Sequence, residues 1–212
     1  MFVGNGPGLN CKVTAQKEFF GGCAGNIAYG LRLLKTPCLL LSLAGTEDFR
    51  RYAQHLNHGL SGVLSVRGVH CAKANIITDP NGTQFTAFSP GPEVDKATWA
   101  THLQNQPFGS VDIFVCAPFP IPLMQSALEI TKASNPNIFN LWVPGQYADS
   151  MQADELRIAI KACDLLVGNT HEIDHIRRTA PGCLTGKSVI ITDGARPVRA
   201  LLSDGNQRTL PT

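Results

Sequence analysis

The pair Gly21-Gly22, followed by Asn26, is the first stretch in which residue types and spacing could do chemistry. Two glycines let a backbone turn sharply and approach a ligand with no Cβ in the way. A helix from about Ala24 would leave its first N–H groups unpaired, which favours polar or anionic ligands. An asparagine amide both donates and accepts, which suits sugar hydroxyls. The same pattern also suits an ordinary glycine turn before a core helix, so spacing alone leaves both interpretations open.

A second stretch, His171-Glu172-Ile173-Asp174-His175, matches the His-Glu-x-x-His pattern of zinc proteases. On a helix this spacing places both imidazoles on one face, with the glutamate beside them as base. The catalytic class needs a third protein ligand, and neither Glu nor His follows His175 in the sequence. Asp193, the nearest substitute, follows a strand beyond the end of that helix. A zinc hydrolase is therefore kept as a minor hypothesis, beside the plainer one of two solvated histidines.

The stretch Pro181-Gly182-Cys183-Leu184-Thr185-Gly186-Lys187-Ser188 imitates a phosphate-binding loop. Its two glycines are one residue too close together for the pattern Gly-x-x-x-x-Gly-Lys-Ser. The apolar residues that follow predict a strand, so no helix N-terminus would be there to receive a phosphate. We therefore reject this stretch as a nucleotide site.

The residues Gly21 to Ala28, followed by a leucine-rich helix, resemble the N-terminal signature Gly-Gly-x-x-x-Asn-x-Ala of the ribokinase-like (PfkB) carbohydrate kinases. They are similar in particular to the adenosine-kinase-like branch. The resemblance implies an ATP-dependent kinase that phosphorylates the hydroxymethyl group of a sugar or nucleoside. It also implies that Gly22 and Asn26, with Gly21 beside them, bind the hydroxyls of that substrate.

Two later stretches are similar to nucleotide-binding segments of the same family. The first is a strand followed by Asn-x-x-Glu, which implies that Asn169 lies near the ATP phosphates and that Glu172 orients Mg²⁺ through water. Magnesium keeps much of its water and needs only one or two carboxylates, so one glutamate suffices. In the second, Thr192 and Gly194 match a Thr-x-Gly turn that contacts ATP. Asn169 also suits a helix N-cap, and the second stretch a plain β-turn.

The residues Pro144-Gly145-Gln146 resemble the Asp-Pro-Gly-Gln found at the end of a central strand in this family, with Val143 in the place of the aspartate. Open α/β sheets bind ligands at the carboxyl ends of their strands. Gln146 is therefore a further candidate for the substrate site.

The elements that must position these residues alternate between helices and strands. Apolar spacing and turn signals predict βαβ units and a mostly parallel sheet with helices on both faces. With the resemblance, they predict an α/β protein with a three-layer α/β/α ribokinase-like core, in a single domain over residues 1–212. The expected helices follow Ala24 and cover 46–58, 123–133, 154–163 and 170–178; the expected strands are 36–45, 63–66, 111–116, 137–143, 164–167, 188–192 and 198–203.

Residues 72–88 are predicted to form a hairpin, because Asp79-Pro80-Asn81-Gly82 is a strong turn signal between two β-prone runs. The resemblance implies that this hairpin is part of a small β lid over the sugar site. A strand at about 11–19 is expected to complete the lid, and a homodimer through the lid is among the expected partners.

Composition excludes several classes of function. The net charge of +2 is small and no basic run is present, so we expect no nucleic-acid partner. The seven cysteines are scattered and odd in number, which favours reduced thiols in a cytoplasmic protein. Residues 1–10 do not resemble a signal peptide, and no apolar run reaches the length of a membrane span.

The family also has a C-terminal Asp-x-x-Gly-x-Gly-Asp, whose last aspartate is the general base. No such sequence is present in these 212 residues, so we assign no catalytic residue and expect a fragment, truncated at both ends and inactive by itself. The first hypothesis is a sugar or nucleoside kinase that uses ATP and Mg²⁺. The second is a non-catalytic sugar- or nucleoside-binding or regulatory protein, and the third is the zinc hydrolase.

Overall fold

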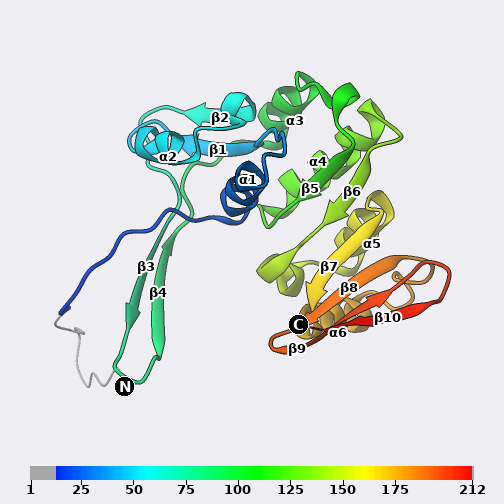
Figure 1. Ribbon diagram of the computed structural model, residues 1–212. Helices are drawn as coiled ribbons and strands as arrows, with labels where there is room; N and C mark the ends of the chain where they lie inside the picture. Colours follow the sequence, from blue (N-terminus) through cyan, green and yellow to red (C-terminus); the bar gives the residue numbers. More distant parts are fainter. Residues whose placement is uncertain (1–12, 212) are drawn as a thin grey trace. The chain divides into compact units, whose positions relative to one another are not determined.

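The computed structural model describes residues 13–211, which divide into two compact units (Figure 1). The first unit ends at Glu93 and the second begins at Val94. Each unit has a cluster of buried apolar side chains of its own. Within the described residues, no helix is both long and apolar enough to cross a membrane, and every cysteine carries a free thiol.

The first unit packs two helices, α1 (Cys23–Leu33) and α2 (Phe49–Leu56), beside a short parallel pair of strands. The strands are β1 (Ser42–Gly45) and β2 (Val63–Val66), and the 3₁₀ helix η1 (Leu60–Gly62) leads into the second of them. Ala28 on α1 and Leu56 on α2 are buried together with Leu40. The helix expected from Ala24 and the strand expected at 63–66 are therefore confirmed.

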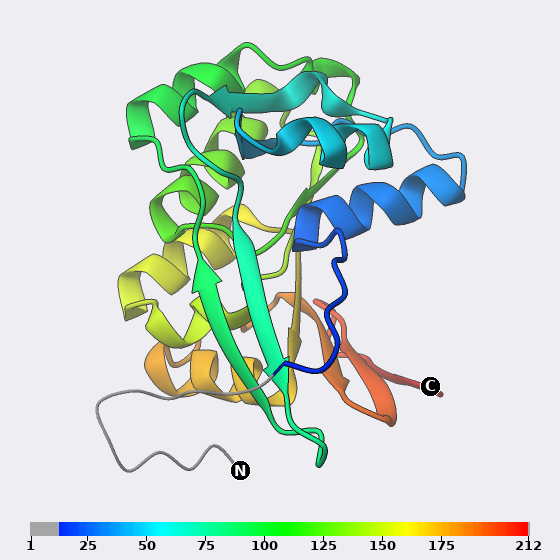
Figure 2. The same cartoon turned by 90° about the vertical axis from the view of Figure 1, so that its left-hand side faces the viewer.

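The hairpin predicted over 72–88 is also confirmed. Strands β3 (Lys73–Thr78) and β4 (Gln84–Ser89) pair antiparallel and run side by side as a ribbon (Figure 2). In the turn, the carboxylate of Asp79 accepts hydrogen bonds from the N–H groups of Asn81 and Thr83, at 2.8 and 2.9 Å. Gly82 has a φ of +84°, which a residue with a Cβ rarely adopts.

The lid strand predicted at about 11–19 is wrong for residues 13–19, which form neither strand nor helix. Residues 11 and 12 lie outside the described part of the chain. Within this irregular segment, Glu18 forms an ion pair with Arg51 of α2, with 3.1 Å between the charged atoms. Because a strand is defined by a ladder of hydrogen bonds to a neighbour, an alternating sequence without that neighbour stays irregular.

The second unit is built on a six-stranded mixed sheet in the order β10-β9-β8-β7-β6-β5. The four strands from β5 to β8 are parallel, and β9 and β10 are antiparallel additions at one edge. The bounds are β5 (Ile113–Cys116), β6 (Phe139–Trp142), β7 (Leu165–Asn169), β8 (Ser188–Asp193), β9 (Arg196–Leu201) and β10 (Gln207–Leu210).

Helices α4 (Ile121–Ser134), α5 (Ala153–Ala162) and α6 (Thr170–Thr179) connect the parallel strands. The core of the unit lies between them and one face of the sheet. The sheet contributes to this core one buried residue from each parallel strand, and these residues are register partners of one another: Cys116, Trp142, Leu166 and Val189. Because these strands follow one another through helices, the expected βαβ arrangement is confirmed for this unit.

Several elements of the second unit were not predicted, among them a helix and an edge strand. Helix α3 (Lys96–Gln104) begins at Asp95, whose side chain accepts a hydrogen bond from the N–H of Thr98 at 2.8 Å. Only Trp99 and Leu103 of this helix are buried, so its apolar pattern is too sparse to stand out in the sequence. The 3₁₀ helix η2 (Phe108–Ser110) follows it. Strand β10 was missed as well, and all four of its residues are exposed.

Candidate functional site

The substrate-side candidates Gly21, Gly22 and Asn26 lie together at the start of α1. Gly22 is the N-cap of this helix and has a φ of +91°, which glycine adopts without strain. The N–H of Asn26 donates to the carbonyl of Gly22 at 2.9 Å and closes the first turn. All three residues are exposed. The turn therefore offers an accessible amide side chain beside the N–H groups of a helix start, which such a helix leaves unpaired.

One contributor to this turn was missed by the sequence analysis. The hydroxyl of Tyr52, on α2, donates a hydrogen bond to the carbonyl of Gly21 at 2.6 Å. The signal in the sequence was Gly25, a glycine inside an expected helix. A Cβ at that position would overlap the Tyr52 hydroxyl.

The nucleotide-side candidates lie at the carboxyl ends of β7 and β8 in the second unit. Asn169 and Thr192 are register partners on these adjacent parallel strands. The side chain of Asn169 accepts a hydrogen bond from the N–H of Glu172, and the carboxylate of Glu172 accepts one from the N–H of Asn169, each at 2.9 Å. This reciprocal capping box begins α6 and fixes both side chains at its N-terminus.

Glu172 carries its charge where the dipole of α6 favours an anion. Its carboxylate and the Asn169 amide supply oxygen donors, the type that Mg²⁺ prefers, and one carboxylate is enough for an ion that keeps most of its water. The residues present therefore fit magnesium held through water. The hydrogen bond from the N–H of Glu172 to the Asn169 side chain also shows that Asn169 is the N-cap of α6, which was the alternative role expected for it.

The turn after β8 is tight and contains the third candidate. Asp193 pairs with Arg196, so Gly194 and Ala195 alone connect β8 to β9. Gly194 has a φ of +59°, as such two-residue turns require. The pairing register of β8 with β9 shifts between Ile191 and Asp193, opposite Pro197, which has no N–H to donate. The shift is centred on Thr192, so this residue stands at a break in the ladder.

Gln146 lies on the 3₁₀ helix η3 (Gly145–Ser150), which directly follows β6 and packs against α6. Its side chain is exposed. The second unit thus gathers Gln146 with the candidates on β7, α6 and β8 along one edge of its sheet. Gly21, Gly22 and Asn26 form a separate group in the first unit.

The His-Glu-x-x-His stretch lies on α6, as predicted. His171 and His175 both face Asp149 of η3, with nitrogen-to-oxygen distances of 3.4 and 3.9 Å. His175 also contacts the hydroxyl of Thr179 at 3.1 Å. Across residues 13–211, no three side chains of His, Cys, Asp or Glu are grouped to hold a metal ion.

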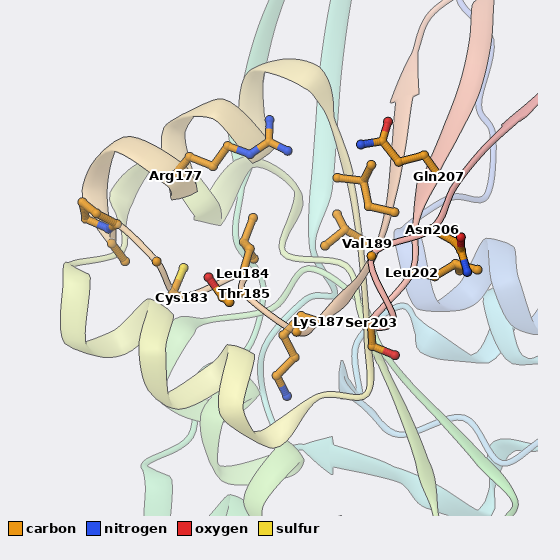
Figure 3. A pocket seen from close by; sticks show the side chains of 16 residues that line it. Arg177, Cys183, Leu184, Thr185, Lys187, Val189, Leu202, Ser203, Asn206 and Gln207 are labelled. Atoms are coloured by element: carbon orange, nitrogen blue, oxygen red, sulfur yellow. The ribbon is translucent and has the colours of Figure 1, made fainter.

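Residues 181–187, in the stretch that imitates a phosphate-binding loop, line a hollow of about 440 Å³ (Figure 3). This hollow lies at the start of β8, the end of the strand away from Thr192. As expected, the stretch forms turns and leads into a strand rather than a helix. The ammonium of Lys187 donates to the carbonyl of Cys163 at 2.8 Å. Burial raises the pKa of the Cys163 thiol to about 11 and also raises that of Cys183. These thiols are therefore poor nucleophiles at neutral pH.

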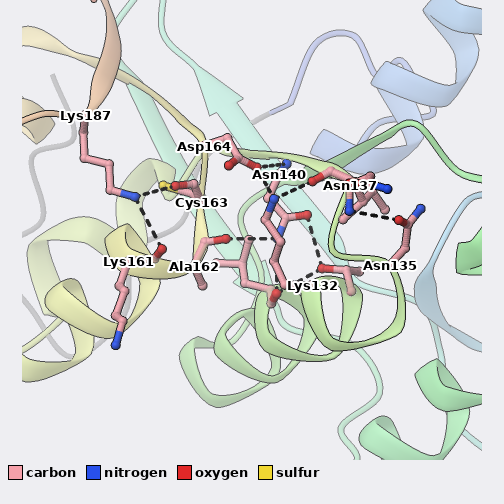
Figure 4. A network of polar contacts seen from close by, with 12 residues as sticks. Lys132, Asn135, Asn137, Asn140, Lys161, Ala162, Cys163, Asp164 and Lys187 are labelled. Carbon is pink, nitrogen blue, oxygen red and sulfur yellow. Dashed lines mark hydrogen bonds and ion pairs between the residues drawn. The ribbon is translucent and has the colours of Figure 1, made fainter. Parts of the chain in front are cut away.

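A buried polar network lies near the starts of β6 and β7 (Figure 4). The Asn140 amide donates to a carbonyl of α4 at 3.2 Å and to one of α5 at 3.0 Å, and it accepts from the hydroxyl of Thr131 at 3.2 Å. The Asp164 carboxylate accepts from the N–H of Asn140 and pairs with Lys132 at 2.7 Å. This network joins two helices to the sheet at the edge away from the candidate residues.

The profile of the pfkB family of carbohydrate kinases matches residues 2–211. A nucleoside kinase of Methanocaldococcus jannaschii is 24% identical over 172 residues, which are 79% of this chain and 54% of the relative. The chain spans about half the length of the curated relatives it matches. These matches confirm the resemblance drawn from the sequence.

Solved structures agree on the fold. A nucleoside kinase of Burkholderia thailandensis in complex with inosine aligns with a TM-score of 0.80 at 24% identity, over 97% of this chain and 67% of that one. The crystal structure of a Methanocaldococcus jannaschii nucleoside kinase, an archaeal member of the ribokinase family, gives 0.81 at 21% identity, over 97% and 69%. The α/β ribokinase-like fold is therefore confirmed.

Proposed function

Because the chain belongs to the pfkB family of carbohydrate kinases, we propose that its protein transfers the γ-phosphoryl group of ATP to the hydroxymethyl group of a nucleoside or sugar. The observation that carries the proposal is the capping box of Asn169 and Glu172 beside Thr192, at the carboxyl ends of two adjacent parallel strands. That edge is where open α/β sheets bind ligands.

On the nucleotide side, this chain contributes charge and position rather than covalent chemistry. Mg²⁺, when bound, would supply positive charge that offsets the charge of the phosphates. Glu172 would hold the hydrated ion through its carboxylate, which is fixed at the start of α6, and Asn169 lies beside it. Thr192 near the end of β8 and Gly194 in the turn after it would face the phosphates or ribose of ATP. In such transfers, catalysis is chiefly positioning and electrostatic stabilisation.

On the acceptor side, Gly22 and Asn26 bind the hydroxyls of the substrate. The exposed Asn26 amide donates to one hydroxyl and accepts from another, while the open glycine turn lets the sugar approach the backbone. Gln146 is a further candidate for this contact. A nucleoside is favoured over a free sugar because the relatives are nucleoside kinases, one of them solved with inosine.

The hairpin supports a further part of the proposal, a homodimer through the lid. Ile76 and Phe88 lie on one face of the β3–β4 ribbon and are 54% and 64% exposed. A second copy that covered this face would remove apolar surface from water. Light scattering after gel filtration should give twice the chain mass for the wild type and a lower mass for Phe88→Lys. A wild-type chain that is monomeric at every concentration tested would contradict this part.

The test of the function is direct. The 212-residue chain is titrated calorimetrically with MgATP and, separately, with inosine, adenosine and ribose, and ADP release is then followed with each acceptor. We expect binding of MgATP and of at least one acceptor. Acceptor binding with no affinity for MgATP would favour the non-catalytic binding protein instead. A chain that bound zinc stoichiometrically, and neither MgATP nor an acceptor, would contradict the kinase.

A further inference from the structure

We propose that Tyr52 is a positioning residue for the acceptor site: its hydroxyl holds the Gly21–Gly22 peptide so that the N–H of Gly22 is turned toward the acceptor hydroxyls. This inference rests on the proposed function, because it deepens the role of Gly22. It concerns the first unit alone, and all the residues that carry it lie between Glu18 and His55.

The hydrogen bond itself fixes a direction. Tyr52 donates to the carbonyl oxygen of Gly21 at 2.6 Å, a short bond that joins α2 to the turn before α1. In a trans peptide the carbonyl and the N–H point in opposite directions. The N–H of Gly22 belongs to the same peptide as that carbonyl, so it points away from Tyr52.

Other contacts of this segment, among them the stack of Phe20 on His55 and the bond from the N–H of Asn26 to the carbonyl of Gly22, do not involve the Gly21 carbonyl. Glycine populates backbone conformations on both sides of φ = 0, so a peptide between two glycines turns over more easily than any other. Gly22 has no side-chain cap of its own, and the chain before it, from 13 to 20, is irregular. Tyr52 therefore selects one orientation of a peptide that the sequence leaves free.

The chain makes room for this tyrosine at a specific position. Gly25 is buried in the first turn of α1, and a Cβ there would overlap the hydroxyl oxygen of Tyr52. A glycine inside a helix costs about 0.5–1 kcal/mol relative to alanine. Gly25, the third glycine of the stretch from Gly21 to Ala28, is thus explained by the phenol that lies against it.

Aromatic packing holds the ring in place. Phe20 lies 5.4 Å from the Tyr52 ring, between centroids, and stacks on His55 at 4.6 Å. His55 in turn stacks on Tyr29 of α1 at 4.8 Å. Burial raises the pKa of Tyr52, so the hydroxyl keeps the proton that it donates throughout the neutral range.

The test compares Tyr52→Phe with Tyr29→Phe. The first substitution removes the donor and keeps the ring. The second removes a hydroxyl from the ring of Tyr29, which stacks on His55, lies 4.7 Å from the guanidinium of Arg32 and packs against the apolar cluster of the first unit. The readout that needs no ligand is the rate of amide hydrogen exchange at Asn26, whose N–H donates to the carbonyl of Gly22. The internal reference is the amide of Leu34 at the other end of α1, whose N–H donates to the carbonyl of Gly30.

We expect Tyr52→Phe to accelerate exchange at Asn26 and leave Leu34 unchanged, while Tyr29→Phe changes neither. Inosine, adenosine or ribose, whichever the wild type binds, should bind about two- to tenfold more weakly to Tyr52→Phe, the size expected for one neutral hydrogen bond, with MgATP affinity unchanged. A structural role alone would lower the melting temperature and accelerate exchange along the whole helix.

Two results would overturn the inference: exchange at Asn26 equal to that of the wild type, or faster exchange with unchanged acceptor affinity. If the wild type binds no acceptor, the proposed function fails, and the exchange measurement still decides whether Tyr52 holds the turn. Gly25→Ala supplies a second variant. Because it displaces the same hydroxyl, its effect on acceptor affinity should not add to that of Tyr52→Phe in the double variant.

Discussion

Asn169 offers a substitution that separates two roles, because it caps α6 and is also assigned to ATP. Asn169→Ala removes the side-chain oxygen that accepts from the N–H of Glu172 at 2.9 Å. Loss of such a cap costs about 1 kcal/mol. For a unit of this size that is a fall in melting temperature of about 4 °C. The affinity for MgATP should fall as well, so this variant alone does not distinguish the roles.

Asn169→Asp does distinguish them. Aspartate caps a helix as well as asparagine, so the melting temperature should stay close to that of the wild type. The substitution removes the amide donor and adds a negative charge where the ATP phosphates are expected. A lost hydrogen bond to a charged group is worth about 1.5–3 kcal/mol, which is roughly 10- to 150-fold in Kd.

The assay is thermal unfolding followed by circular dichroism, together with calorimetric titration of MgATP into each variant. We expect normal stability and weak MgATP binding for Asn169→Asp. Wild-type MgATP affinity in this variant would show that Asn169 is a helix cap and nothing more, and would remove it from the nucleotide site.

Two further predictions concern stability. Asn140→Ala should lower the free energy of unfolding of the second unit by roughly 1–3 kcal/mol, because it removes the two hydrogen bonds that the buried amide donates to carbonyls of α4 and α5; an effect under about 0.5 kcal/mol in urea unfolding would contradict this. The N–H of Cys71, with the His70 imidazole nearby, lowers the pKa of Asp48. Because the folded pKa lies below the unfolded one, the first unit should lose stability as the pH falls below about 4. Urea unfolding between pH 3 and 6 should show a weaker pH dependence for Asp48→Asn than for the wild type.

The sequence was sufficient to predict the elements that an apolar run or a turn signal marks. Strand β2 and the hairpin of β3 and β4 were found because a turn signal or an apolar run marks them. Helix α3 was missed because Trp99 and Leu103 are its only buried residues. The strand expected near 11–19 failed because alternation within a segment does not say whether a neighbouring strand is there to pair with it.

The candidate site shows the same division between local and distant information. Asn169 and Glu172 are three residues apart, so their capping box could be read from spacing alone. Tyr52 lies 31 residues from the carbonyl it contacts, and nothing near Gly21 in the sequence points to it. The buried Gly25 was the only local trace of this contact, and its meaning depends on which side chain packs there.

The most direct test of the account is a crossed titration of two variants with two ligands. Asn26→Ala should weaken acceptor binding by about 0.5–1.5 kcal/mol, roughly two- to tenfold, and leave MgATP binding unchanged. Glu172→Gln should do the reverse, because glutamine still completes a capping box while the charge that orients Mg²⁺ is lost. The account predicts this crossed pattern in calorimetric titrations with inosine, adenosine or ribose and with MgATP. If Asn26→Ala abolished MgATP binding and spared the acceptor, the assignment of the two sites would be contradicted.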